Sequence, residues 1–366
     1  MNPLLRTLLL IAASGGYPPR IWSLFEREGL PPEAFVQKGP DLWKRIGCTE
    51  QVAETMERLL GNHWPEREAE RAEKKGVRLV TFNDTDYPRS LTGVPGAPLL
   101  LFVRGKWPLS GIAAAVVGTR KCSSYGFRTA TEIGKAVGDA EGIVVSGGAI
   151  GIDRAAHEGC LSSGGNTIAV LGNGVDITYP GGHERLFERI VSGGGALVSE
   201  YPLGTPPRPW RFPERNRIIA ALAEKLVVVE APIKSGAMVT ARLALEIGRE
   251  VWAVPGRISE ENCSGSNRLL YDGALALVSV SDFVSLAFGR QLGLFRQNDS
   301  RESVSALTEK EQRILAVLKK SGERTVDNLA VEGTMSPADV FSCLATLAAA
   351  GHVFPSGPGR WSAVPG

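Results

Sequence analysis

Short runs of Val, Ile, Leu and Ala alternate with segments of helical pattern through residues 76–288. A run that is apolar at nearly every position has no polar face to turn toward water, so it predicts a strand buried on both sides. Such strands with helices between them are typical of a mostly parallel, doubly wound α/β sheet. The predicted strands are 77–82, 99–103, 113–118, 142–146, 167–172, 195–200, 225–230, 250–254 and 274–278.

Three further segments flank this predicted core in a chain of 366 residues, which is long enough for several folded parts. Residues 1–75 predict a bundle of short helices of the SAM or helix-hairpin-helix type, which serves either packing and protein contacts or DNA-backbone binding. Residues 289–307 are polar and unpatterned, which indicates a linker. Residues 308–366 predict three helices and two short strands, a winged-helix-like domain. The predicted N-terminal helices are 3–13, 20–28, 31–37, 41–46, 50–60 and 63–75.

The overall charge excludes a protein that is held on nucleic acid by a global basic field. Forty-one Lys and Arg against 39 Asp and Glu leave a net charge of +2, so any basic footprint must be local. Five scattered cysteines without a CxxC pair, and four separated histidines, argue against a metal site or a disulfide framework and favour the cytoplasm. The apolar stretch 4–13 is too short for a membrane span, and we interpret it as a helix.

Residues 208–217, RPWRFPERNR, combine a high density of arginines with aromatic side chains. Four arginines lie among Trp210 and Phe212 with one acid, Glu214. Pro213 suits the first turn of a helix, which would continue through residues 218–225 and precede the strand at 225–230. Guanidinium groups and aromatic rings at a helix N-terminus suit a ligand that has phosphates and flat bases.

Glycine-rich loops follow several of the predicted strands. Gly118, Thr119 and Arg120 form one such turn, where free backbone N–H groups beside an arginine predict an anion site rather than a merely solvated turn. The next strand ends in SGGAIGID (146–153), whose GGxxG spacing differs from the GxGxxG of nicotinamide dinucleotide sites. If the strands are parallel, all these loops share one edge and form an extended groove.

Asp153 and His157 lie four residues apart, on one face of a predicted helix. This spacing suits a metal or a proton relay, but it also suits a capping carboxylate and a packed side chain that hold the loop, which is the interpretation we favour. The chain contains no GxSxG, no Walker GxxxxGK[ST] and no HExxH motif. We therefore expect a binding protein without a cofactor, and not an enzyme.

The ordered motifs resemble those of the DNA-processing protein A (DprA/Smf) family over about residues 80–280. They include VVGTR, SGGAIGID, IAVLGNGVDITYP, SEYPLG, FPERNRIIA and VVVEAPIKSGAMVTA. The resemblance implies an extended Rossmann-like core that binds single-stranded DNA. It also implies a homodimer that protects incoming DNA and loads RecA recombinase in natural transformation and recombination, with single-strand binding protein displaced.

The strand-end loops and the resemblance together give one set of predicted DNA-binding residues. Glu214 and Ile150 depart from the family pattern. In the alternative interpretation that this leaves open, some of the arginines are structural, Glu214 pairs with Arg217, and Asn216 caps loops. The predicted residues are Gly118, Thr119, Arg120, Ser146, Gly147, Gly148, Gly151, Asn173, Gly174, Phe212, Arg215, Asn216, Arg217, Ser235 and Gly236.

Two other functions compete with this one. The core resembles, more distantly, the nucleotide phosphoribohydrolases, whose PGGxGTxxE loop corresponds here to APIKSGAMVTARLALE, without the PGG run or the glutamate at that spacing. The second competing function is that of a regulator that reads duplex DNA through residues 308–366. The helix at 336–350 contains no Lys or Arg, and six basic residues balance six acids over 308–366, so we expect a partner-binding or self-association module there.

Overall fold

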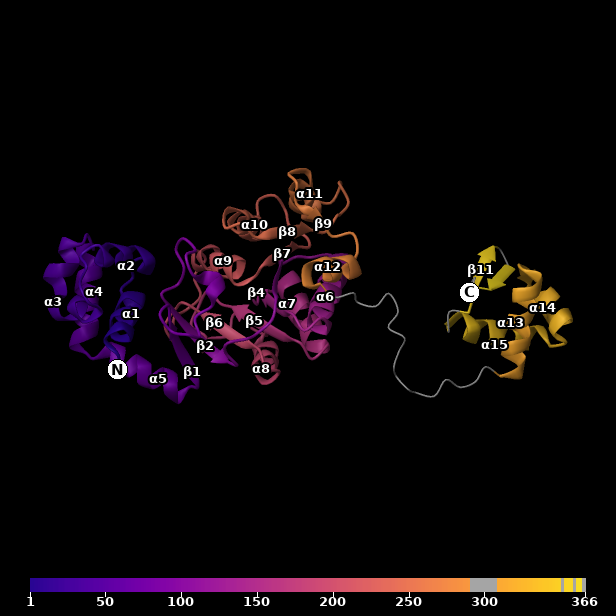
Figure 1. Cartoon of the computed structure of the whole chain (residues 1–366), viewed down its shortest axis with the longest axis horizontal. Helices are drawn as coiled ribbons and strands as arrows, with labels where there is room; N and C mark the ends of the chain where they lie inside the picture. The colour runs from indigo at the N-terminus through magenta and orange to yellow at the C-terminus, as the bar shows by residue number, and fades with distance from the viewer. Residues whose placement is uncertain (290–307, 350–351, 358–359, 364–366) are drawn as a thin grey trace. The chain divides into compact units, whose positions relative to one another are not determined.

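The computed structural model describes residues 1–289, 308–349, 352–357 and 360–363 of the chain (Figure 1). Two compact units are formed, Met1–Leu294 and Phe295–Gly366. The predicted linker, 289–307, lies outside the described residues except for Gly289. Among the described helices, none combines the length and the apolar character that crossing a bilayer requires.

A nine-stranded sheet forms the centre of the first unit, in the order β1-β2-β6-β5-β4-β3-β7-β8-β9. Every predicted strand is present. From β6 across to β9 the neighbours are parallel, as predicted, whereas β1 pairs antiparallel with β2 and β2 with β6. The strands are β1 (Val77–Thr81), β2 (Leu100–Gly105), β3 (Ala113–Val117), β4 (Ile143–Ser146), β5 (Asn166–Val170), β6 (Ala196–Ser199), β7 (Lys225–Val228), β8 (Glu250–Ala253) and β9 (Leu275–Ala276).

Helices cover both faces of this sheet, because alternate residues of each central strand point to opposite sides. Ala115 and Val117 of β3 belong to the apolar cluster under α9, α10 and α11. Ala114 and Val116 belong to the cluster under α6, α7 and α12. The helices are α6 (Ser124–Asp139), α7 (Ile152–Ser162), α8 (Glu184–Ser192), α9 (Arg211–Leu222), α10 (Gly236–Glu246), α11 (Ser264–Tyr271) and α12 (Val280–Phe288), with short 3₁₀ turns η1 (Arg89–Leu91) and η2 (Glu261–Cys263).

The N-terminal helices share their core with the sheet. Their apolar side chains form one buried cluster with Phe102, Leu171 and Leu197. The expected boundary near residue 75 falls between α5 and β1, but the buried cluster continues across it. Helix α3 consists of two helical segments that meet at Gly39, where the backbone is not helical and φ is 56°, so the two predicted helices 31–37 and 41–46 are confirmed. These helices are α1 (Pro3–Ala13), α2 (Pro18–Glu26), α3 (Pro32–Arg45), α4 (Glu50–Gly61) and α5 (Trp64–Lys74).

The second unit has its own core and the predicted winged-helix order of three helices and a hairpin. Ile314, Leu318, Leu329 and Leu344 are buried in it. A short additional strand, β10, joins the hairpin in a three-stranded sheet of order β10-β12-β11. The elements are α13 (Glu309–Ser321), β10 (Arg324–Thr325), α14 (Val326–Gly333), α15 (Pro337–Ala349), β11 (Val353–Gly357) and β12 (Arg360–Ala363).

Candidate nucleic-acid interface

The carboxyl ends of β3, β4 and β7 meet at one edge of the sheet and open into a groove. Beyond β3 the chain order turns to β4 on one side and to β7 on the other, which is the switch point where doubly wound sheets bind ligands. The groove encloses about 1360 Å³, including space open to solvent. It is lined by Val117, Gly118, Thr119, Arg120, Lys121, Ala149, Asp153, Tyr179, Pro209, Phe212, Pro213, Arg215, Asn216, Ile219, Pro232, Lys234, Ser235, Gly236, Ala237 and Thr240.

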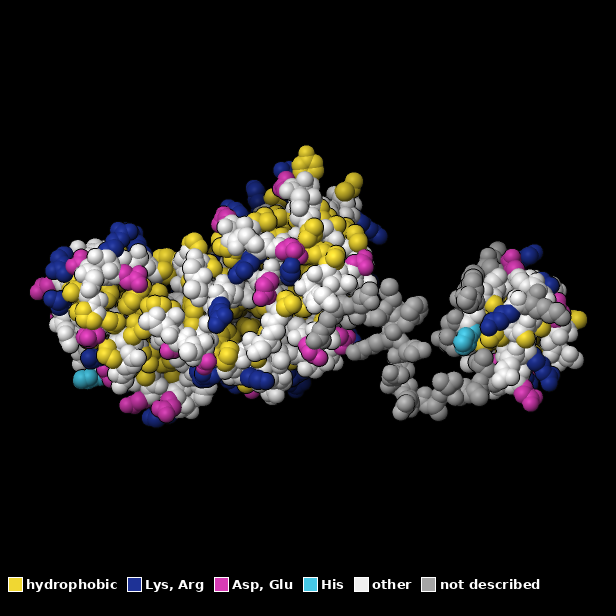
Figure 2. All heavy atoms as spheres, viewed as in Figure 1, with side chains coloured by type: hydrophobic (Ala, Val, Ile, Leu, Met, Phe, Trp, Pro, Cys, Tyr) yellow, Lys and Arg dark blue, Asp and Glu magenta, His cyan; other side chains and the backbone are white. Residues whose placement is uncertain are grey.

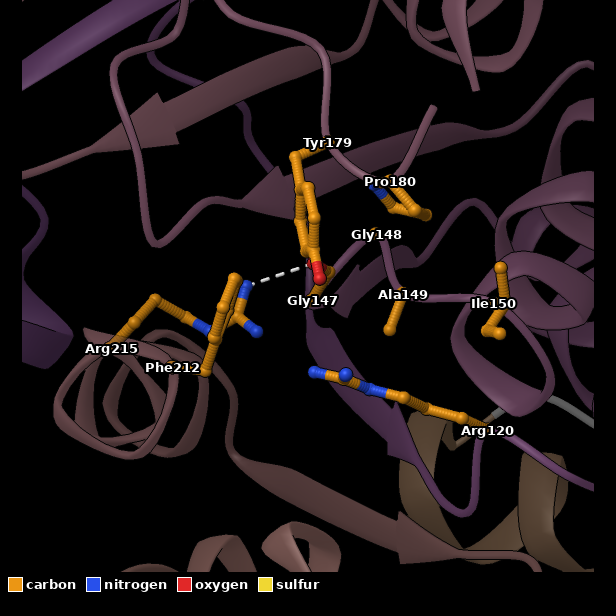
Figure 3. Close-up of a pocket in the computed structure, with 9 residues that line it drawn as sticks. All are labelled: Arg120, Gly147, Gly148, Ala149, Ile150, Tyr179, Pro180, Phe212 and Arg215. Atoms are coloured by element: carbon orange, nitrogen blue, oxygen red, sulfur yellow. Dashed lines mark hydrogen bonds between the residues drawn. The ribbon is translucent and has the colours of Figure 1, made fainter. Parts of the chain in front are cut away.

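A smaller inner pocket of about 380 Å³ adjoins the groove and shares several of its residues. At its centre the Phe212 and Tyr179 rings are stacked, with centroids 5.3 Å apart and planes 28° from parallel. The Arg120 guanidinium reaches over the Phe212 ring at 5.5 Å from the centroid, as Figure 3 shows. Gly172 makes this possible, since a Cβ there would lie 2.9 Å from Phe212 Cδ1. The lining is completed by Gly147, Gly148, Ala149, Ile150, Pro180 and Arg215.

The groove is electropositive for two reasons. Helices α6, α7, α9 and α10 all begin at this edge, so their positive dipole ends and free N–H groups point toward it. Exposed Arg120, Lys121 and Lys234 add three cations. Elsewhere basic and acidic groups are interspersed, and Figure 2 shows no continuous basic field on the face in view. The basic footprint is therefore local, as the net charge of +2 predicts.

Among the described residues that line the groove, Asp153 is the one with a carboxylate, and this carboxylate already accepts hydrogen bonds from the protein backbone. It is buried at the start of α7, where it accepts hydrogen bonds from the N–H groups of Gly147 at 3.0 Å and Ala149 at 3.4 Å. Burial raises the pKa of Asp153, and the nearby Arg215 guanidinium opposes that rise. Asp153 therefore holds the glycine loop, as the favoured interpretation expects, but it does not cap α7, whose N-cap residue is Gly151 without a side-chain hydrogen bond.

Arg215 is a buried anchor beneath the inner pocket. Only 4% of the residue is exposed, and its guanidinium donates to the carbonyl of Gly147 at 2.8 Å and to that of Val170 (Figure 3). Burial lowers the pKa of Arg215 to about 10, so the group stays cationic at neutral pH. The side chain thus ties α9 to the ends of β4 and β5, and its charge contributes to the pocket from below.

Side chains of the neighbouring loops fix the rest of the groove. Asn216 Nδ2 donates to the carbonyl of Gly236 at 3.2 Å, which is the loop-capping role considered from the sequence. Ser235 caps α10 through the Met238 N–H. Ser123 caps α6, and its own N–H donates to the buried Glu230 carboxylate at 2.8 Å. The loops are therefore ordered before any ligand arrives.

The sequence of this groove-bearing core matches one family along most of its length. The family model of DNA recombination-mediator protein A matches residues 78–287. The chain belongs to this family. A Mycobacterium tuberculosis chain described as DNA processing protein DprA is 35% identical over 370 residues, covering 93% of each chain. Protein Smf of Escherichia coli is 40% identical over 219 residues, 59% of each chain.

Solved structures of the family share the fold. The crystal structure of DNA processing protein A from Streptococcus pneumoniae aligns with a TM-score of 0.66 at 33% identity, over 75% of this chain and 95% of that one. The Helicobacter pylori protein, solved in work on its single-stranded DNA binding mode, aligns with a TM-score of 0.52 at 26% identity, over 58% and 96%. The resemblance of the motifs to the DprA/Smf family is confirmed.

Ten of the residues predicted for this family site line the groove or the inner pocket: Gly118, Thr119, Arg120, Gly147, Gly148, Phe212, Arg215, Asn216, Ser235 and Gly236. Arg215 and Asn216 donate to the carbonyls of Gly147 and Gly236, so the structure gives both side chains an anchoring role.

The sequence predicts Arg217 in the DNA-binding groove, and the structure corrects its place, because Arg217 lines neither the groove nor the inner pocket. Its guanidinium grips both carboxylate oxygens of Glu200, at 2.8 and 2.6 Å, and donates to the Gly96 carbonyl at 2.7 Å. Burial alone would lower the pKa of Arg217, but the Glu200 charge raises it above its usual value. The i+3 partner considered from the sequence, Glu214, supplies only its backbone carbonyl.

Four smaller residues of the predicted set also line neither the groove nor the inner pocket. Ser146 is buried and donates to the Val116 carbonyl at 2.7 Å. Asn173 is buried and donates to the carbonyls of Gly174 and Ile177, which shapes the turn after β5. Gly151 has φ 83° and lies where a Cβ would meet the Thr119 carbonyl at 2.4 Å. These residues, with Gly174, allow the loops to pack together and do not face the ligand space.

Among the groove-lining residues that sequence reasoning missed are Lys121, Tyr179, Pro209 and Lys234. Lys121 directly follows the predicted Arg120, and Lys234 precedes the predicted Ser235, so extending each loop by one residue would have found both. Tyr179 belongs to the IAVLGNGVDITYP motif, but its neighbours in the sequence do not mark it as a groove residue, because it meets Phe212 only in the folded chain.

His157 gives a pH-dependent prediction for stability. The side chain is fully buried, its Nδ1 lies 2.7 Å from Thr167 Oγ1, and burial lowers its pKa to about 3. Since the folded state then binds fewer protons than the unfolded chain between pH 6.5 and 3, stability falls as the pH drops through this window. From pH 7 to pH 5 we expect His157 to remove about 2 kcal/mol of unfolding free energy.

Urea denaturation at the two pH values, for wild type and His157→Asn, measures this contribution. Asparagine keeps a donor toward Thr167 but does not titrate, so the loss between pH 7 and 5 should shrink by about 2 kcal/mol. An equal pH dependence in both proteins would show that the unfolded-state protonation of His157 does not matter.

Proposed function

We propose that this chain binds single-stranded DNA along the groove at the carboxyl edge of its sheet. The observation that supports this most is the Arg120–Phe212–Tyr179 stack, which joins a cation to two aromatic rings at the mouths of helix N-termini. Arginines and loop N–H groups bind phosphates without sequence preference, and aromatic rings stack exposed bases. The Helicobacter pylori relative was solved in work on single-stranded DNA binding, which agrees with this assignment.

A single strand suits this groove better than a duplex does. The Phe212 ring is only partly exposed within a pocket, so a base reaches it only when it is splayed away from a complementary strand. In the described part of the second unit, acids neutralise several of the cations: Lys310 pairs with Asp339, and Arg324 pairs with Glu332. We therefore propose that the second unit binds a protein partner or another copy of this chain.

In the cell, we propose that this activity serves natural transformation and recombination. The chain would act in the cytoplasm as a homodimer that protects incoming strands, displaces single-strand binding protein and loads RecA. Membership of the DNA recombination-mediator protein A family supports this role. RecA-catalysed ATP hydrolysis on single-stranded DNA coated with single-strand binding protein tests it, since a loading protein shortens the lag before hydrolysis begins.

Binding, and not hydrolysis, is the chemistry that we propose for the groove. The carboxylate that lines it among the described residues, Asp153, is buried and already accepts two backbone N–H groups. A nucleotide phosphoribohydrolase needs a carboxylate that is free to attack or to stabilise the sugar carbon. Incubation with nucleoside monophosphates should release no free base, and release of base would favour the enzyme.

Salt dependence of oligo-dT binding tests the phosphate contact of Arg120. We expect Arg120→Ala to weaken binding and to flatten the slope of log K against log salt concentration by roughly 0.7, because one fewer phosphate is neutralised. Arg189→Ala is the matched control, since Arg189 is exposed near the end of α8, toward the other edge of the sheet. Equal slopes for wild type and Arg120→Ala would remove Arg120 from the contact.

Phe212 should contribute through stacking and not through charge. Phe212→Ala is expected to reduce oligo-dT affinity by about 1–3 kcal/mol while leaving the salt slope unchanged. Phe212→Tyr keeps an aromatic face and serves as the control. Wild-type affinity for Phe212→Ala would show that bases do not reach the inner pocket.

A further inference from the structure

Trp210 is exposed beside the groove in a way that sets it apart from most of the other tryptophans. It immediately precedes the first turn of α9, with 59% of its surface exposed. Trp22, Trp43, Trp107 and Trp252 are all less than 9% exposed. Because a large flat ring loses favourable burial when it faces water, such exposure marks a surface that binds something.

Arg208 makes this exposed ring suitable for a nucleic acid. Its guanidinium lies 5.9 Å from the Trp210 ring centroid, and it forms no ion pair with any residue that the structure describes. The neighbouring Arg211 is engaged instead, stacked on Tyr201 at 4.9 Å and bonded to the Pro206 carbonyl. With Arg215 and Arg217 also committed to protein partners, Arg208 is the arginine of segment 208–217 that is left to meet a phosphate.

The backbone that carries Trp210 is already stiff. Pro206, Pro207 and Pro209 each restrict φ to about −65°, and the Thr205 carbonyl accepts the Gly174 N–H at 3.0 Å. A ring on such a segment loses little further freedom when a ligand stacks on it, so the full stacking energy is available for binding.

The position of Trp210 continues the path of the groove. Pro209 and Phe212 both line the groove, while Trp210 lies between them in the chain and lines neither hollow. Residues two apart in a helix point about 200° apart, so the Trp210 ring lies on the outer side of the turn that presents Phe212 inward. A strand that leaves the groove over Pro209 therefore meets Trp210 next.

We propose that Trp210 and Arg208 form a second base-stacking platform, outside the groove, for a nucleotide adjoining the one that stacks on Phe212. The proposal rests on the proposed single-stranded DNA binding and extends it by a residue-level contact. Indole stacks the base, and the Arg208 guanidinium binds the flanking phosphate.

Tryptophan fluorescence with oligo-dT probes this contact directly, because Trp210 is far more exposed than the four buried tryptophans. A dT oligomer of about 12 nucleotides should quench the emission of wild type, and Trp210→Phe should lose most of that quenching while keeping affinity within about threefold. Trp210→Ala should weaken binding of the 12-mer by about 5- to 150-fold, which corresponds to one lost stack. A short oligomer that fills only the inner pocket should lose less.

Three results separate the failures. If the 12-mer binds wild type but Trp210→Ala binds it equally well and the quenching persists in Trp210→Phe, the platform is refuted while single-stranded DNA binding stands. If the 12-mer does not bind wild type at all, the proposed function fails and the platform with it. If Trp210 emission changes with protein concentration in the absence of DNA and is indifferent to oligo-dT, the ring contacts another copy of the chain and the platform is refuted.

Discussion

Replacing Arg217 by alanine is expected to lower the free energy of unfolding by about 3–5 kcal/mol, because it leaves the largely buried Glu200 carboxylate without its counter-charge. The lost guanidinium also releases the Gly96 carbonyl, which it binds at 2.7 Å. Gly96 lies against the hydroxyl of Tyr17, the residue that precedes α2, so the change also loosens the contact between the N-terminal helices and the core. Urea denaturation followed by circular dichroism measures the loss.

A double variant separates charge from packing at this pair. Arg217→Met combined with Glu200→Leu removes both charges together, and we expect it to recover most of the stability, since no buried charge is then left unpaired. The salt slope of oligo-dT binding should stay at the wild-type value in the double variant. A slope that flattens by roughly 0.7 would return Arg217 to the DNA contact and contradict the structure.

Replacing Arg215 by alanine is expected to cost a similar 3–5 kcal/mol and also to weaken DNA binding. The guanidinium joins the carbonyls of Gly147 and Val170 and offsets the buried charge of Asp153, so its removal frees the loop that lines the inner pocket. Loss of affinity should therefore accompany loss of order in the loop, in contrast with Arg120→Ala, which should keep full stability.

Arg215→Lys is an informative companion to the alanine variant. Lysine retains the positive charge but cannot bridge two carbonyl groups with a planar fork, so stability should lie between that of wild type and alanine. Urea denaturation and oligo-dT titration are run in parallel on both variants. Full stability in Arg215→Ala together with a flatter salt slope would identify Arg215 as a phosphate contact and not an anchor.

Much of the candidate site is visible in the sequence because its parts are local. Gly118, Thr119 and Arg120 follow a strand whose apolar run predicts its end, and Ser235 precedes a helix that it caps. Parallel pairing then brings these loops to one edge whatever the details of packing. The antiparallel pairing of β1 and β2 is not visible in the same way, because a continuous apolar run indicates burial on both faces but not strand direction.

The environments of the arginines in segment 208–217 do not follow from the local sequence. The composition of the segment predicts a cationic, aromatic helix start near a phosphate ligand, and in the structure Phe212 and Arg215 line the inner pocket. The four arginines nevertheless have four different environments: Arg208 stacks on Trp210, Arg211 on Tyr201, Arg215 lies beneath the pocket, and Arg217 pairs with Glu200.

By itself, the sequence determined the order of strands and helices, the family and the loops that form the groove, since each depends on the spacing of neighbouring residues. Only the tertiary structure decided which cations face the groove. A guanidinium pairs with the carboxylate or free carbonyl that lies nearest to it in space. The partners of Arg215 and Arg217, which are Gly147, Val170 and Glu200, are not their neighbours in the chain. The division of the arginines into anchors and candidate DNA contacts is therefore a property of the fold.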